Sequence, residues 1–179
     1  MSSWGQRAVT VLVNSMRDLL SGARVGLVAT GAMSLLMLAG RRLGLTGTLP
    51  PRTITDRAVQ ELGAGDRPSR DDRQLLAGFV HFTFGAGAGA LFGLLTAGLR
   101  SLRISTGLGI AYGTVVYLLS YMGWIPALNI MPPASRDRPG RVATMIGAHW
   151  VYGALLGLLV ALARRRRMLE KQARRRFAT

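Results

Sequence analysis

Two copies of one six-residue stretch decide how this chain folds: His81-Phe82-Thr83-Phe84-Gly85-Ala86 and His149-Trp150-Val151-Tyr152-Gly153-Ala154. Each copy lies inside a long apolar segment. Each is also preceded by a polar loop that carries a proline pair, Pro50-Pro51 or Pro132-Pro133. A recurring unit of this kind indicates an internal duplication. We therefore expect a repeated unit that consists of a helix, a proline-containing loop and a histidine-bearing helix.

The apolar segments are long enough to cross a lipid bilayer. Residues 75–99 run for 25 residues without a formal charge, and at about 1.5 Å per helical residue they exceed the roughly 30 Å hydrocarbon core. Residues 142–163 and about 106–125 are further uncharged runs. Residues 25–40 form a shorter run, which spans if the flanking arginines reach toward the head groups. The sequence therefore predicts an all-α membrane protein, a bundle of four transmembrane helices.

The four spans group into two hairpins that enter the membrane in the same direction, because each unit contains an even number of spans. We expect parallel helical-hairpin repeats at residues 25–99 and 100–163, with outer loops at 41–74 and 126–141, related by a pseudo-axis along the membrane normal. Residues 1–24 place apolar side chains on one side of a helix. This pattern predicts an N-terminal amphipathic helix in the inner interface, or alternatively a helix that binds a partner or caps the bundle.

The positive charge of the chain gathers next to the last span. The net charge is +15, and residues 164–179 form a basic tail. Cationic residues beside a span favour the cytoplasmic side, so we predict that both termini are cytoplasmic. Arg164, Arg165, Arg166 and Arg167 would hold anionic lipid of the bilayer there. Because the membrane accounts for this charge, we do not expect nucleic acid as a partner.

Glycines spaced four residues apart line the predicted spans, and each histidine heads one such series. This spacing lets helix backbones approach closely in lipid. We expect the glycines to pack helix against helix, and we expect His81 and His149 to face the interior as an intramembrane polar pair. The predicted packing positions are Gly85, Gly89, Gly93, Gly109, Gly113, Gly153 and Gly157.

An ionisable side chain inside a membrane is a candidate functional group. Three explanations of the histidine pair stay open. The rings could ligate haem or a metal, sense the outside pH, or bond a backbone carbonyl or a tyrosine and hold the helix pair together. The spans contain no evident third ligand and the chain has no cysteine. We therefore predict no cofactor and no metal site, with haem or metal through His81 and His149 as the alternative.

The two outer loops share the order of proline pair, short spacer and Asp-Arg. Proline pairs fix extended backbone and end helices, so they are expected to shape the loops. Residues 53–62 predict a short helix capped by Thr53 or Thr55. The alternative role for the motif is a polar outer mouth above the histidines. Its residues are Pro50, Pro51, Arg52, Asp56, Arg57, Pro132, Pro133, Asp137 and Arg138.

Four motifs follow one another along roughly residues 25–167. They are Leu49-Pro50-Pro51-Arg52, His81-Phe82-x-Phe84, Met122-Gly123 leading to Pro132-Pro133, and Gly147-x-His149 before the terminal arginine cluster. In this order they resemble the YagU-type family of bacterial inner-membrane proteins, whose role is not established. The resemblance implies a small helical protein of the bacterial inner (plasma) membrane and supplies no reaction.

No residue pattern in the chain indicates catalysis. The sequence shows no Ser-His-Asp set, HExxH motif, phosphate-binding glycine loop or carboxylate pair at chemical spacing. We therefore predict a non-enzymatic integral inner-membrane protein, an accessory subunit of a larger membrane complex or an envelope-homeostasis factor. The alternatives are a small transporter or channel that self-associates, and a pH-responsive or haem- or metal-binding membrane protein that uses the paired histidines.

Overall fold

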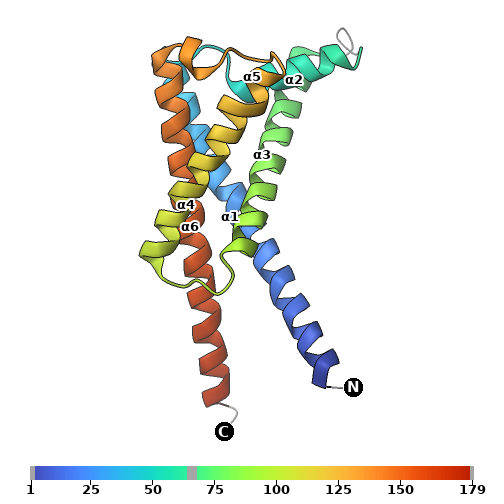
Figure 1. Cartoon of the computed structure of the whole chain (residues 1–179), viewed down its shortest axis with the longest axis vertical. Helices are drawn as coiled ribbons and strands as arrows, with labels where there is room; N and C mark the ends of the chain where they lie inside the picture. Colours follow the sequence, from blue (N-terminus) through green and yellow to red (C-terminus); the bar gives the residue numbers. More distant parts are fainter. Residues whose placement is uncertain (1–2, 64–67, 178–179) are drawn as a thin grey trace.

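The computed structural model describes residues 3–63 and 68–177, with side chains from residue 5 onward. Residues 1–2, 64–67 and 178–179, which belong to the predicted interfacial helix, first outer loop and basic tail, lie outside the described residues. Every regular element in the described part of the chain is helical (Figure 1). The elements are α1 (Ser3–Arg42), α2 (Pro50–Glu61), α3 (Arg70–Leu95), α4 (Leu102–Tyr117), η1 (Leu118–Trp124), α5 (Ile125–Ala127), η2 (Ala134–Arg136) and α6 (Pro139–Arg176).

In the described part of the chain, four helical segments are long and apolar enough to cross a membrane. They are Gly5–Arg42, Arg70–Leu95, Leu102–Ala127 and Pro139–Arg176. Helix α1 packs against α3, α4 packs against α6, and α1 also packs against α6. The order across the bundle is therefore α3, α1, α6, α4. Both ends of the chain lie at one end of the molecule, here called the tail end, whereas α2 and α5 lie at the other, the loop end (Figure 1).

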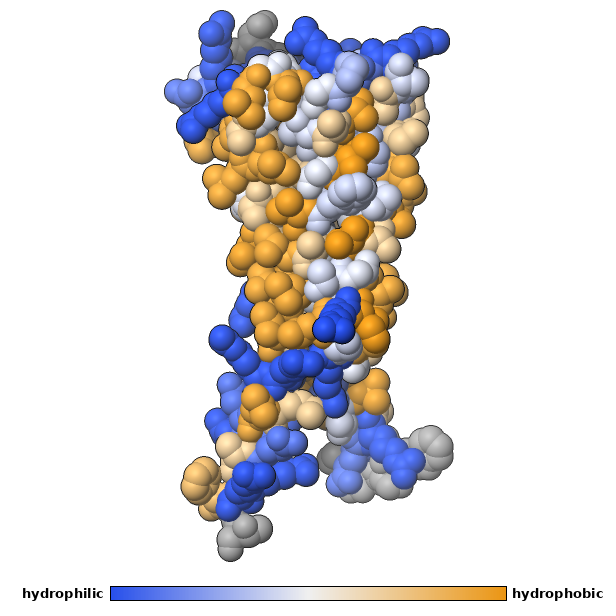
Figure 2. Space-filling model, turned by 90° about the vertical axis from the view of Figure 1, so that its left-hand side faces the viewer, coloured by the Kyte–Doolittle hydropathy of each residue, from blue (hydrophilic) through white to orange (hydrophobic). Residues whose placement is uncertain are grey.

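The surface suits a bilayer. Figure 2 shows an apolar middle section with hydrophilic residues gathered at both ends. Large apolar side chains are exposed on this middle section, among them Leu35, Phe79 and Leu119. Such a band is what lipid tails contact, and the charged ends match the head-group regions. The predicted four-span, all-helical architecture is therefore found in the structure.

Helix α1 differs from its predicted division into an interfacial helix and a short span. It runs without a break through residues 24 and 25, for 40 residues in all. The predicted boundary rested on the charge of Arg24, but a single exposed arginine does not interrupt helical hydrogen bonding. The side chains of residues 5–17 are mostly exposed, so this part projects from the bundle at the tail end, whereas Asp18 already meets α3 at Gly93. An interfacial position for this part stays a prediction.

Helix α3 begins and ends at local signals that the uncharged run of residues 75–99 does not reveal. At its start, the Ser69 hydroxyl accepts from the Asp72 backbone N–H at 3.1 Å, and the Asp72 carboxylate accepts from the Ser69 N–H at 3.0 Å. This capping box starts the helix at Arg70. At its end, Gly98 adopts a φ of 85°, which reverses the chain after Leu95.

The second hairpin is held by direct backbone contact between α4 and α6. A Cβ added to Gly109 would lie 2.0 Å from the carbonyl oxygen of Gly153, and one added to Gly157 would lie 2.0 Å from that of Ser105. A Cβ on Gly113 would lie 2.3 Å from the carbonyl oxygen of His149. No side chain fits at these positions without moving a helix.

The first hairpin is packed in the same manner. A Cβ on Gly85 would lie 1.9 Å from the Thr30 hydroxyl oxygen, and one on Gly93 would lie 2.4 Å from the Asp18 carbonyl oxygen. Gly89 meets Gly22 and Gly26 of α1, two packing glycines that the sequence analysis did not single out. Both interfaces therefore depend on glycine, while a relation by rotation about the membrane normal stays a prediction.

Adding one methyl group to α4 should change the free energy of unfolding differently at two positions. We expect Gly109→Ala to lower the free energy of unfolding by about 1–3 kcal/mol, because its Cβ forces α4 away from α6. Gly107→Ala is the matched control, since Gly107 faces open space. It should be neutral or stabilising by up to about 1 kcal/mol. Unfolding in mixed micelles followed by circular dichroism measures both, and equal effects would contradict this packing.

Candidate functional site

A cavity of about 160 Å³ lies inside the bundle, in its loop-end half. Helices α1, α2, α3 and α6 and the α4–η1 segment all contribute to its walls. His81 of α3 and His149 of α6 both line it, so the structure brings the two predicted histidines to one space. The rest of the wall is largely apolar, with methionine, proline and aromatic side chains.

The cavity lies where the backbones of α3 and the α4–η1 segment do not pack closely against each other. Instead, tyrosines bridge to α3 from the second hairpin. The Tyr112 hydroxyl donates to the Ala88 carbonyl at 2.8 Å, and the Tyr152 hydroxyl donates to the Gly85 carbonyl at 2.8 Å. Phe92 packs against the Tyr112 ring, with centroids 5.3 Å apart. These bridges hold α3 at a distance that leaves space beside His81.

One wall of the cavity is a π-helix. The segment η1 supplies Ser120, Tyr121 and Trp124 to the lining. Pro126 lies two residues after its end, and a proline removes a backbone donor and clashes with the carbonyl four residues earlier. A wider helical turn relieves this clash. Because π-helical turns are rare and occur frequently at functional sites, η1 marks this wall as a candidate site.

Most polar groups of the wall are already hydrogen-bonded within the protein. The Thr30 hydroxyl donates to the Gly26 carbonyl at 2.7 Å, and the Ser120 hydroxyl donates to the Val116 carbonyl at 2.6 Å. The Tyr121 hydroxyl donates to the carboxylate of Asp137. These hydroxyls therefore stabilise the wall, and the two imidazoles are what the cavity offers to a bound molecule.

His149 is fixed by its Nδ1 atom. This nitrogen lies 2.7 Å from the carbonyl oxygen of Met145, one turn earlier in α6. A carbonyl oxygen only accepts, so Nδ1 carries the hydrogen and Nε2 of the neutral ring is an acceptor. The ring edge also contacts Tyr117, with centroids 5.4 Å apart. The backbone-carbonyl bond, one of the three explanations left open by the sequence, is thus present at this histidine.

His81 is different, because its Nε2 atom is buried and has no hydrogen-bond partner in residues 3–63 and 68–177. A buried polar atom without a partner costs about 1–3 kcal/mol, so natural proteins rarely keep one without a reason. The part of the chain with described side chains holds no group of three or more His, Cys, Asp or Glu side chains that would bind a metal ion. Three other buried atoms of the described residues also lack a partner, Thr46 Oγ1, Ser105 Oγ and Arg141 Nε, but His81 Nε2 is the one of the four that lines the cavity.

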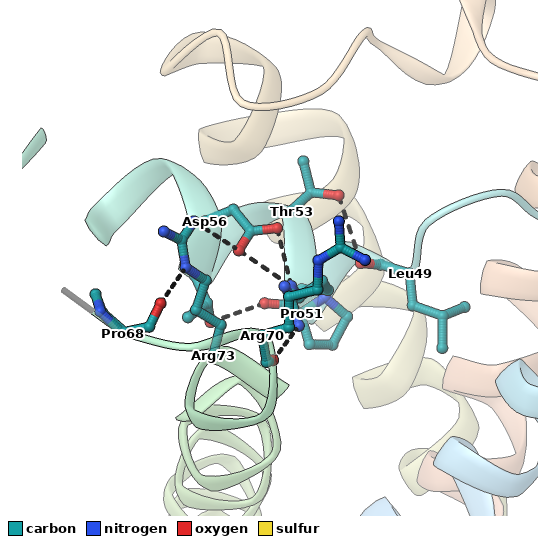
Figure 3. Close-up of polar contacts among 9 residues, drawn as sticks. Leu49, Pro51, Thr53, Asp56, Pro68, Arg70 and Arg73 are labelled. Carbon is teal, nitrogen blue, oxygen red and sulfur yellow. Dashed lines mark hydrogen bonds and ion pairs between the residues drawn. The ribbon is translucent and has the colours of Figure 1, made fainter. Parts of the chain in front are cut away.

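The first outer loop ties α2 to the start of α3. The Arg52 side chain donates to the Asp56 carboxylate at 2.9 Å and to the Arg70 carbonyl at 3.0 Å. Arg73 lies 3.7 Å from the same carboxylate. Figure 3 shows Asp56 of α2 facing the first turn of α3. Arg57 pairs instead with Glu61 on the exposed side.

Helix α2 begins earlier than the predicted short helix at residues 53–62. Pro50 and Pro51 occupy its first turn, where proline is tolerated because the first N–H groups have no helical partner. Leu49 caps it without a side-chain bond, so neither Thr53 nor Thr55 is the cap. Both prolines line the cavity. This proline pair therefore covers the histidines at the loop end.

The second outer loop fixes the π-helical wall. The Asp137 side chain is 3% exposed and lies 3.1 Å from Arg141, and it also accepts the Tyr121 hydrogen bond. Its other oxygen accepts from the Arg138 backbone N–H at 2.7 Å at the start of α6. Pro132 and Pro133 are exposed and do not line the cavity. Sequence analysis had grouped Asp137 with the loop but had not linked it to Tyr121.

Comparison with known proteins gives the family of the chain. The model of a family of unknown function (DUF6789) matches residues 16–171. The chain belongs to this family. The match runs from α1 to α6 and includes both histidines, and nothing in it links the chain to the YagU-type family specifically. No curated protein and no solved structure matches the chain.

Arg164 of this DUF6789 protein lies inside the bundle at the tail end. Its side chain is 7% exposed and lies 3.3 Å from the Asp18 carboxylate of α1. It also donates to the carbonyls of Gly93 at 2.5 Å, Thr96 at 2.7 Å and Leu99 at 3.3 Å. These carbonyls lie at and just beyond the end of α3, where helical partners run out.

The next three tail arginines are placed differently. Arg165 and Arg166 are exposed and Arg167 is half-buried. Arg165 donates to the Arg100 carbonyl at 3.0 Å. Lipid anchoring by the tail stays a prediction, and Arg164 already has protein partners.

Removing the Arg164 guanidinium should destabilise the protein far more than removing that of Arg166. We expect Arg164→Met to cost about 3 kcal/mol or more of unfolding free energy, because Asp18 and the α3 carbonyls lose a buried partner. Arg166→Met should stay within about 0.5 kcal/mol. Denaturation in mixed micelles measures both, and a small effect at Arg164 would show that these contacts do not hold the helices together.

Proposed function

We propose that this DUF6789 protein is a non-enzymatic integral membrane protein that binds a small, mostly apolar molecule in its histidine-lined cavity. The main support is the His81 Nε2 atom, which is buried in an otherwise apolar wall without a partner in the described part of the chain. Binding sites for small molecules are typically apolar with a few placed polar groups. A ligand that hydrogen-bonds this nitrogen would remove the cost of leaving it unpaired.

The size of the cavity limits the ligand. Its 160 Å³ is close to the engineered cavity of about 150 Å³ that stays dry and binds benzene. It is smaller than the roughly 300–1,000 Å³ of pockets that enclose drug-sized ligands. The part of the ligand held beside the histidines is therefore about the size of one ring.

The position of the cavity favours entry from the bilayer. Several lining residues also reach the apolar surface: Val80 and Phe84 of α3 are 46% and 52% exposed, and Trp124 of η1 is 38% exposed. These residues flank the space between the backbones of α3 and the α4–η1 segment. A molecule dissolved in lipid would meet this apolar opening without crossing a charged surface.

The hydrogen bonds that the polar groups of the cavity already make favour a binding role over catalysis. Ser120 donates its hydroxyl to a backbone carbonyl and not to either histidine, so it is not activated as a nucleophile. His149 uses Nδ1 to hold its own orientation. The imidazole nitrogens of the cavity can therefore recognise a ligand by hydrogen bonding. This property suits an accessory subunit or a carrier within a larger membrane assembly.

We place the protein in a bacterial inner membrane with both termini cytoplasmic. In support, α1 begins and α6 ends at the same end of the molecule (Figure 1), and this tail end carries the basic end of α6, Arg100 of the short loop and Arg103 in the first turn of α4. The loop end carries arginines mixed with acids. Basic residues near span ends favour the cytoplasm. The tail would then contact anionic lipid, each cation contributing about 1 kcal/mol near the surface.

Filling the cavity should abolish binding of a ring-sized probe. We expect fluorobenzene to bind the wild type saturably in nanodiscs, with empty nanodiscs subtracted, as followed by fluorine NMR. Ala88→Phe places a ring in the cavity and should remove this binding. Gly87→Phe is the matched control, because the neighbouring position faces open space. Absence of saturable binding in a folded wild type would refute the proposed function.

The orientation can be tested with single cysteines, because the chain contains none. We expect Leu62→Cys at the exposed loop end to react with a membrane-impermeant maleimide in intact spheroplasts. Arg166→Cys at the tail end should react only after permeabilisation. The reverse pattern would place the termini outside the cytoplasm.

A further inference from the structure

Resting on the proposed function, we infer that the cavity binds a neutral phenolic ring, whose hydroxyl group hydrogen-bonds both His81 and His149. The inference uses three properties of the cavity beyond its presence: the chemistry of its apolar wall, the hydrogen-bonding capacity of the two imidazoles, and the charge of its lining.

The apolar wall suits a flat ring. Three methionines line it, Met33 and Met37 from α1 and Met145 from α6. Methionine sulfur makes favourable contacts with aromatic rings, worth about 0.3–1.5 kcal/mol each. Phe84 and Trp124 add aromatic side chains at the opening. A ring held among these groups would gain more than a saturated chain of the same volume.

The imidazoles select a hydroxyl group. Nε2 of neutral His149 accepts, because Nδ1 donates to Met145, so the ligand must bring a donor. His81 Nε2 has no partner within the described residues, and a neutral imidazole nitrogen can donate or accept according to its tautomer. A hydroxyl both donates and accepts, so one such group can serve both rings. A ketone or ether could not, since it would leave the His149 acceptor unpaired.

The lining selects a neutral ligand. No Asp, Glu, Lys or Arg is among the described residues that line the cavity. The nearby Asp137 carboxylate is already bound by Tyr121 and Arg141. A carboxylate or ammonium group would therefore lose its hydration without gaining a counter-charge, which costs several kcal/mol. Phenolic hydroxyls are uncharged near neutral pH, since their ordinary pKa is about 10.

The hydroxyl contribution can be measured by comparing two probes of nearly equal size. We expect 4-fluorophenol to bind the wild type about five- to tenfold more tightly than fluorobenzene, after correction for partition into empty nanodiscs. His81→Leu and His149→Leu should each reduce this preference to about twofold or less. Fluorobenzene binding should persist in both variants, and it reports that the cavity is still folded. His149→Gln keeps an acceptor and should restore part of the preference.

The possible results separate the two proposals. Equal binding of both probes to the wild type would overturn the phenolic inference while leaving a ring-binding protein. A preference that survives both leucine variants would also overturn it. If neither probe binds the wild type saturably, the result refutes the proposed function as well.

Two classes of molecule in a bacterial membrane carry a phenolic ring of this kind. They are free phenols and hydroquinones with an apolar tail. Competition between 4-fluorophenol and a hydroquinone with a decyl tail decides between them. Displacement at concentrations below those of untailed hydroquinone supports the membrane-borne class. Displacement only by the untailed compound supports a free phenol. Displacement by neither would overturn the inference.

Discussion

Backbone contact between helices at glycine is the constraint on which the rest of the structure depends. Where Gly109 meets Gly153, and Gly22 meets Gly89, two helices approach until main-chain atoms touch. In lipid, such close packing replaces the hydrophobic effect as the force that joins helices. Helix α3 has no glycine contact of this kind with α4, and Tyr112 and Tyr152 bridge to it instead. The cavity is therefore the space left where the glycine packing stops.

Lipid also requires that polar groups find partners inside the protein. Hydroxyls in the spans donate to carbonyls one turn earlier, as Thr30 and Ser120 do. At the tail end, the Arg164 guanidinium donates to carbonyl oxygens at the end of α3 that lack a helical partner. Four buried side-chain atoms of the described residues still lack a partner, and of these His81 Nε2 lines the cavity, whereas Ser105 Oγ, Thr46 Oγ1 and Arg141 Nε do not. Exceptions that line a cavity occur where a protein reserves a group for a ligand.

The sequence predicted what depends on composition and spacing, and missed what depends on tertiary contact. Uncharged runs located four spans, and the glycine spacing predicted that both histidines face the interior, where they line one cavity. The continuity of α1 was missed because a boundary was drawn at a charge. The π-helix depends on how Pro126 is accommodated, which no apolar pattern shows. Arg164 cannot be told from its three arginine neighbours until the end of α3 is seen to meet it.

The two copies of the recurring stretch contribute unequally to one site. In the first copy, Pro50 and Pro51 cover the cavity and His81 keeps a free nitrogen. In the second, the loop carboxylate of Asp137 holds the wall through Tyr121, and His149 is fixed by its own helix. The first copy therefore presents a nitrogen without a protein partner, while the second presents an acceptor nitrogen in a fixed orientation. If both rings were fixed through Nδ1, both Nε2 atoms could only accept a hydrogen bond, whereas two free rings would lack a defined geometry. The asymmetry is what allows a pair of similar histidine helices to form a selective site.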